Sequence, residues 1–262
     1  MIVLPRRPSP DRWRRRGPLW VRRERVTGAR FLPFALPISA TNLTSGADET
    51  DGPWTTASIT PGANRLILAA FYARHAGGTP SASLSGNGLT WVQIANINWA
   101  PAAAITLYLF RSMGASPSTG AITISFGAAV VHGVWIVDEI ASVDTTGTNG
   151  SGAVVQSATN SADAASLTVT LAAFGSADNG TYGTFAQGGS QTITPGTGFT
   201  ELAEIAPANG LAMNTEWRND NDTTVDASWA VGTLCGGIAI EIKFAAAGGA
   251  TTPLRTLLGV GT

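Results

Sequence analysis

The sequence is poor in charge, in lysine and in cysteine. Charged residues make up 13% of the 262 positions, against about 25% in ordinary soluble domains, and Lys243 is the one lysine. Cys235 is the one cysteine, so a disulfide within the chain is excluded and the redox compartment stays open. A surface with so few charges has to be covered by Thr, Ser, Asn and Gly. This composition favours strands and turns over exposed helices.

Long apolar runs and targeting signals are also missing. No stretch of about 18 apolar residues occurs, so we expect no membrane-spanning helix. Prolines interrupt the positively charged N-terminus where a secretory signal would need an apolar segment, so we expect no signal or transit peptide.

Enzyme motifs are absent as well. The chain has no HExxH, CxxC or GxSxG, and its two Gly-x-Gly pairs, at 86–88 and 196–198, are interpreted as hairpin turns. A dyad of Cys235 with one of the two histidines is conceivable, but a lone cysteine beside a strand usually behaves as a small apolar residue. We therefore expect no catalytic residues and no cofactor.

The charge is distributed very unevenly. Residues 1–30 hold ten basic and two acidic residues, a net charge of +8, whereas residues 31–262 hold six basic and fifteen acidic residues, a net charge of −9. The chain is thus predicted to be a basic arm on an acidic body. The ten basic residues are Arg6, Arg7, Arg12, Arg14, Arg15, Arg16, Arg22, Arg23, Arg25 and Arg30.

The arm is predicted to span residues 1–37 and to be extended, because its prolines restrict the backbone and remove N–H donors. Arginine binds carboxylates and phosphates in a bidentate manner, so the arm suits either an acidic protein surface or a nucleic acid. Interleaved prolines and apolar residues favour protein, since a purely electrostatic arm needs neither. The apolar anchors are Trp13, Trp20, Phe31 and Phe34.

Period-2 patterns indicate that the body, residues 38–247, is all-β. No helix-period segment of useful length interrupts them. Turn signals rich in Gly, Pro and Asn separate the strands at spacings near 10–20 residues, which predicts a jelly-roll-like β-sandwich. The expected strands are 66–73, 89–97, 105–111, 121–126, 131–140 and 238–244.

The second half of the body resembles the first. Gly86-Asn-Gly-Leu-Thr90 returns as Gly196-Thr-Gly-Phe-Thr200, and further matches follow in order at offsets that drift from 111 to 103. We predict a diverged duplication, with repeat one at about 54–143 and repeat two at about 153–245, joined by a flexible polar linker. Each repeat could form its own small sandwich; we favour strands from both repeats in two shared sheets, because a half-size core stabilises poorly.

Residues 248–262 form a short apolar tail with no domain of its own. Such a tail is expected to pack on the body or to dock on a neighbouring molecule. Its candidate docking residues are Leu254, Leu257, Leu258 and Val260.

Carboxylates and tryptophans supply weaker candidates. Asp220, Asp222 and Asp226 form a possible calcium site, although the glycine and glutamate of an EF-hand are missing, and a Thr/Asn/Asp-rich turn is favoured. Glu201 with Asp220 and Asp222 would serve a hydrolase. Core packing is favoured over a carbohydrate platform for the tryptophans. The platform candidates are Trp54, Trp99 and Trp217, and the expected core members are Trp91, Trp135 and Trp229.

A family resemblance extends over about residues 50–245. It is carried by the two turns at 86–92 and 196–200, by Glu139-Ile-Ala-Ser-Val-Asp144 with the Thr-Thr-Gly-Thr-Asn that follows, and by Trp229. The chain resembles a widespread group of twofold-repeat β proteins of bacteria and phages, many of them uncharacterised or virion-associated. The resemblance implies a β-sandwich and brings no catalytic residues.

The combined expectation is a non-enzymatic structural protein of the bacteriophage virion, either a capsid decoration protein or a fibre or spike component. Its partners would be capsid or tail subunits held by the arm, with nucleic acid as the less favoured partner and no membrane. We expect a homo-oligomer, such as a trimer. The alternative is a carbohydrate-binding or adhesin module on a virion or cell surface.

Overall fold

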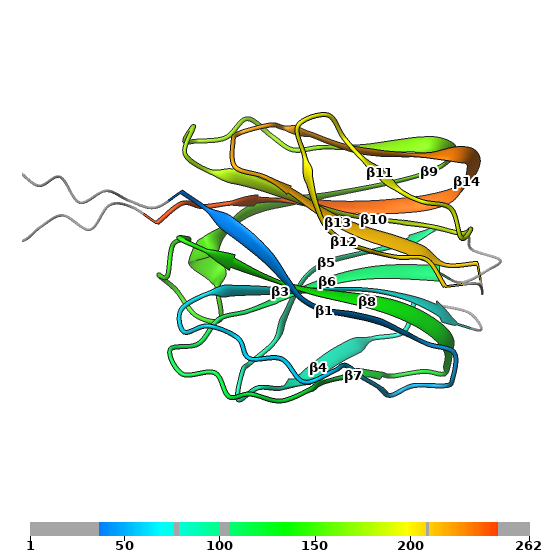
Figure 1. Ribbon diagram of the computed structural model, residues 1–262, viewed down its shortest axis with the longest axis horizontal. Coiled ribbons are helices and arrows are strands. Elements are labelled where there is room, and N and C mark those ends of the chain that lie inside the picture. Colours follow the sequence, from blue (N-terminus) through cyan, green and yellow to red (C-terminus); the bar gives the residue numbers. More distant parts are fainter. Residues whose placement is uncertain (1–36, 76–78, 100–104, 208–209, 246–262) are drawn as a thin grey trace, which may run out of the picture. The chain divides into compact units, whose positions relative to one another are not determined.

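The computed structural model describes residues 37–75, 79–99, 105–207 and 210–245. The chain divides into two units, residues 1–33 and 34–262, and every described residue belongs to the second. The described part is all-β, built from antiparallel sheets with one short 3-10 turn, η1 (Ser151–Ala153) (Figure 1). No helix in these ranges is long and apolar enough to cross a membrane.

The first half of the body forms a five-stranded sheet in the order β1-β8-β3-β6-β5 and a three-stranded sheet in the order β2-β7-β4. A core of aromatic and branched side chains, among them Trp54, Phe71 and Ile124, packs between the two sheets. The strands are β1 (Ser39–Asp48), β2 (Trp54–Thr55), β3 (Leu66–His75), β4 (Ala82–Gly86), β5 (Val92–Trp99), β6 (Ile105–Ser112), β7 (Ile122–Phe126) and β8 (Val130–Ala141).

The second half forms one sheet in the order β11-β14-β10-β13-β12, with β9 paired to β14. The register of the β9–β14 pair shifts between Ser228 and Thr233, so each of these long strands has two portions. The early portion of β14 lies between β9 and β11, and the late portion between β9 and β10. The strands are β9 (Val154–Thr170), β10 (Gly180–Gln187), β11 (Thr194–Pro195), β12 (Thr200–Ile205), β13 (Ala212–Arg218) and β14 (Thr224–Ile242).

The two halves have the same strand order. The order β9-β14-β10-β13-β12 corresponds, strand for strand along the chain, to β1-β8-β3-β6-β5. The end of β9, the start of β14 and β11 likewise correspond to β2-β7-β4. The halves differ in continuity, because β9 and β14 each run through both layers whereas β1–β2 and β7–β8 are separate strands.

The large sheets of the two halves pack face to face around one core, which includes Tyr72, Leu107, Ile136, Tyr182 and Ile240. β1 contacts β12, β8 contacts β12 and β13, β5 contacts β9 and β14, and β6 contacts β14. Exchanging each strand for its counterpart in the other half turns this set of contacts into itself. The interface therefore has the pattern of a twofold-related pair.

The expectation of two sheets shared between the halves is wrong, because every strand of each sheet comes from one half. A half that formed its own sandwich was expected to have too small a core, and the structure enlarges the buried core in another way. Each half covers one face of its large sheet with its own strands and the other face with the partner half. Burial on both faces explains the uninterrupted apolar character of β3.

Two boundaries also differ from the sequence prediction. The first half starts at β1, at Ser39, and so before the start expected for repeat one at about 54, although close to the start expected for the body at 38. β1 was not expected as a strand because its residues are small and polar, apart from Leu43. The linker expected to be flexible is a hydrogen-bonded turn. Gly152 N–H donates to Thr146 O at 3.1 Å, and an Arg111 guanidinium N–H donates to Asn149 O at 2.9 Å.

Candidate functional site

The described chain enters and leaves the body at one place. Ser39, at the start of β1, pairs with Ala141, and the Ala245 N–H donates to Ser142 O at 2.9 Å (Figure 1). Residues 1–36 and 246–262 are therefore joined to the same end of the body, which we call the attachment end. The predicted arm residues from Arg6 to Phe34 and the predicted tail residues Leu254, Leu257, Leu258 and Val260 lie outside the described residues.

A pocket of about 500 Å³ opens at the attachment end. Its floor is Glu241, which is 1% exposed and accepts hydrogen bonds from Asn179 Nδ2 and Gln156 Nε2, both at 2.6 Å. Val155 and Phe244 line the same pocket. It thus combines a buried carboxylate with apolar walls, the mixture that ligand and peptide pockets use for orientation and affinity.

Lys243 lines this pocket as well, but its ammonium group forms an ion pair with a carboxylate outside the pocket lining. Its Nζ lies 2.7 Å from Asp144 Oδ2, and this contact holds the pKa of Asp144 down at about 2, with help from the Thr146 side chain and N–H. The ion pair joins the turn after β8 to the end of β14. It therefore ties the two halves together at the attachment end.

A buried polar network crosses the interface between the large sheets. Asp138 on β8 accepts hydrogen bonds from Asn42 Nδ2 and from the Tyr182 hydroxyl of the opposite sheet, both at 2.9 Å. Burial raises the pKa of Asp138 to about 6, although the bonds from Asn42, Thr215 and Tyr182 lower it in part. Such a network fixes how the two sheets are placed on one another.

The interior of the second half contains another buried carboxyl, Glu216 on β13. Its oxygens form no well-aligned hydrogen bond, and its pKa is raised to about 8, first by burial and then by the Asp226 charge. The Gly196 N–H and the Asn214 side chain lower it only partly. Burial therefore favours the protonated form of Glu216. The sequence analysis did not single out this residue.

The calcium site considered as the weaker alternative at Asp220, Asp222 and Asp226 is not supported. Arg218 Nε lies 2.6 Å from Asp220 Oδ2, and its Nη1 lies 2.7 Å from Asp222 Oδ2. A guanidinium thus holds the place that a cation would need. No group of three or more acidic, His or Cys side chains in the described ranges is arranged to hold a metal ion.

The same pairing opposes the hydrolase prediction for Asp220, Asp222 and Glu201, because two of the three carboxylates are committed to Arg218. The Cys235–histidine dyad does not form either. The Cys235 thiol is buried, donates to Ala162 O at 3.3 Å and has a raised pKa, with burial as the main cause. His75 Nε2 is hydrogen-bonded to Thr106 Oγ1 at 2.9 Å.

The core packing favoured for Trp54 and Trp99 is confirmed, because both side chains are buried, and neither can serve the alternative carbohydrate platform. Trp217 is partly buried and packs against the core between the large sheets. The expected core members are confirmed for Trp135 and Trp229, which are buried, whereas Trp91 is only half-buried against the first-half core.

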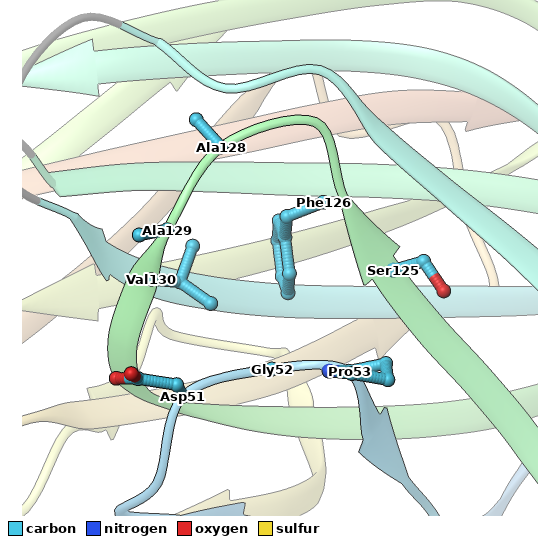
Figure 2. A pocket seen from close by; sticks show the side chains of 8 residues that line it. All are labelled: Asp51, Gly52, Pro53, Ser125, Phe126, Ala128, Ala129 and Val130. Carbon is cyan, nitrogen blue, oxygen red and sulfur yellow. The ribbon is translucent and has the colours of Figure 1, made fainter.

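A second pocket, of about 350 Å³, lies at the other end of β1 from the attachment end. Figure 2 shows the Phe126 ring beside Val130 and above the Asp51–Pro53 segment. The ring packs edge-on against Trp54, with the ring centroids 4.8 Å apart. Phe126 is thus a wall of the first-half core that is partly open to solvent.

Exposed apolar side chains also occur away from the attachment end. Val131, on β8, follows the pocket residue Val130 in the sequence, and Val231 and Leu234 lie at the register shift of β14. Val155, at the first pocket, is the remaining large apolar side chain with high exposure in the described part of the chain.

Comparison with known proteins adds no name to these sites. No family model matches the chain, and no curated protein and no solved structure matches it. The resemblance to twofold-repeat β proteins of bacteria and phages remains a prediction.

Proposed function

We propose that this chain is a non-enzymatic structural protein of a bacteriophage virion, either a capsid decoration protein or a fibre or spike component. The observation that carries the proposal is the shared attachment end. The arginine-rich segment and the apolar tail of the sequence are joined to the body near Ser39 and Ala245, which are bound to the neighbouring residues Ala141 and Ser142. We propose that the arm at this end contacts neighbouring subunits and that the rest of the body projects outward.

The topology of the body supports this proposal by analogy. In the first half, β1-β8-β3-β6 in one sheet and β2-β7-β4 in the other follow the strand order of a jelly roll. Jelly rolls are common in viral capsid proteins and in lectins, although a fold alone does not decide function. We propose that the second half is a diverged copy of this jelly roll. The shared strand order and the twofold pattern of contacts support the duplication.

The carboxylates of the body support a structural role. Asp144 joins the two halves, Asp138 bridges the two large sheets, and Asp220 and Asp222 fix the β13–β14 turn through Arg218. Each of these groups is held by a partner that keeps the fold in place. We further propose that the partners are other virion proteins and further copies of the chain, arranged for example as a trimer, with nucleic acid as the alternative partner of the arm.

Deleting residues 2–30 tests the proposal. We expect the truncated protein to fold, because the described body begins at residue 37, and its amount in purified particles to fall at least tenfold. Immunoblotting of particles grown with either version measures this loss. Replacing all ten arginines by lysine is the matched control. It keeps the charge, so attachment should fall only in part if bidentate arginine contacts carry it. Undiminished attachment of the truncated protein would contradict the proposal.

A further inference from the structure

We propose that the C-terminal segment, residues 246–262, folds back onto its own body and fills the pocket lined by Val155, Asn179, Glu241, Lys243 and Phe244. The inference does not depend on the proposed function. It assigns a ligand class to the pocket, namely a short peptide with branched apolar side chains and one guanidinium.

The pocket has room for a cation beside its carboxylates. A carboxylate can accept about four hydrogen bonds, and Glu241 receives two, both from neutral amides. Asp178 adds a second carboxylate, which is exposed at the pocket. Lys243 is the one cation among the described lining residues, and it is paired with Asp144. Within the part of the chain that the structure describes, Glu241 and Asp178 thus have no ion pair, and the pocket has an excess of negative charge.

The pocket is also lined by apolar side chains that are exposed to solvent. Val155 is 51% exposed, although most large apolar side chains of the body are buried, and Phe244 is only partly buried. An occupant that covered both side chains would gain about 25 cal/mol for each Å² of apolar surface removed from water. The occupant that suits these walls carries branched apolar side chains next to a positive charge.

The C-terminal segment has this composition. Arg255 is its one charged side chain, and Leu254, Leu257, Leu258 and Val260 surround it in the sequence. A guanidinium binds carboxylates in a charge-assisted, bidentate manner. The segment also starts at the pocket, since Phe244 is a lining residue and Arg255 follows it by eleven positions. A flexible chain of that length spans roughly 15–20 Å, and such a tether gives an effective concentration in the millimolar range.

A disulfide trap tests the docking in the purified full-length protein. The pair Thr256→Cys with Val155→Cys places one thiol in the tail and one in the pocket, and the native Cys235 is buried. We expect this pair to form an intrachain disulfide at least tenfold faster than the control pair Thr256→Cys with Val231→Cys. Val231 is 66% exposed and precedes Glu241 by ten positions on β14. Equal rates for the two pairs, or covalent dimers in place of intrachain bonds, would overturn the proposal.

The role of the guanidinium is tested in the same trap by Arg255→Gln, which changes no described residue of the body. We expect the rate of intrachain disulfide formation to fall at least fivefold, and Asp178→Asn to lower it by a smaller factor. Arg255→Lys should restore part of the rate, because the charge returns without the bidentate geometry. An unchanged rate in Arg255→Gln would show that the pocket does not recognise the cation, and would overturn the assignment.

Discussion

The free energy of unfolding is expected to fall by several kcal/mol when the pH rises from about 4.5 to about 8.5. Two buried carboxyl groups cause this loss. Glu216 lies inside the second half with a pKa of about 8, and Asp138 lies between the large sheets with a pKa of about 6. Burial is the main cause of both shifts, because a charged carboxylate loses its hydration inside the core.

The sign follows from proton linkage. A carboxyl whose pKa is higher in the folded state than in the unfolded state binds its proton more tightly when folded. Its contribution is fully present below the unfolded pKa, near 4, and is lost as the pH rises through the folded pKa. Asp138 therefore acts between about pH 4 and 6, and Glu216 between about pH 4.5 and 8. At roughly 1.4 kcal/mol per pH unit, the upper limits are ~3 and ~5 kcal/mol.

Urea unfolding followed by tryptophan fluorescence at closely spaced pH values measures this profile. Glu216→Gln should remove the loss between pH 6 and 8, because a neutral amide replaces the protonated carboxyl, and Asp138→Asn should remove part of the loss below pH 6. The exposed Asp163, on β9, supplies the control: Asp163→Asn should leave the profile as it is. A stability that rises over this pH range would contradict the assignment of both groups.

Replacing Trp54 by alanine is expected to destabilise the protein by about 3–5 kcal/mol, the usual range for removing a buried aromatic side chain. Trp54 is 0% exposed, its Nε1 donates to Thr50 O at 3.0 Å, and its ring packs against Phe126 and Trp135. The ring also lies over Gly133, where an added Cβ would collide with it. The cavity left by alanine would thus open inside a closely packed core.

Thermal and urea unfolding measure this loss, with Trp217→Ala as the matched control. Trp217 is partly buried, so its replacement should have the smaller effect. A Trp54→Ala variant that kept its stability and lost the ability to bind a glycan would restore the carbohydrate platform that the structure rejects.

The strands with the strongest apolar pattern were predicted from the sequence, and the polar ones were not. The predictions at 66–73, 105–111 and 131–140 are confirmed by β3, β6 and β8, because branched and aromatic residues covered on both faces leave a continuous signal. β1 was missed, since the small and polar residues of an edge strand resemble a loop. Which strands share a sheet depends on contacts distant in the sequence, and local patterns do not specify them.

The candidate sites were predicted less well, for a related reason. The sequence shows Asp220 and Asp222 as a carboxylate cluster, but only the structure shows that Arg218 neutralises both. Asp138 could have been noticed, because it follows an uninterrupted apolar run in β8, whereas Glu216 lies among other polar residues of β13 and gave no such signal. The direction of a side chain, toward solvent or toward a core, decides whether such a residue is ordinary or has a strongly shifted pKa.

Quantitative mass spectrometry of purified phage particles tests the central claim most directly. If this chain is a virion component held by its attachment end, its peptides should be present at a fixed ratio to the major capsid or tail protein. That ratio should persist through a second round of density-gradient purification. Particles that are infectious and of normal composition, yet contain this chain only in traces that vary between preparations, would contradict the proposed function.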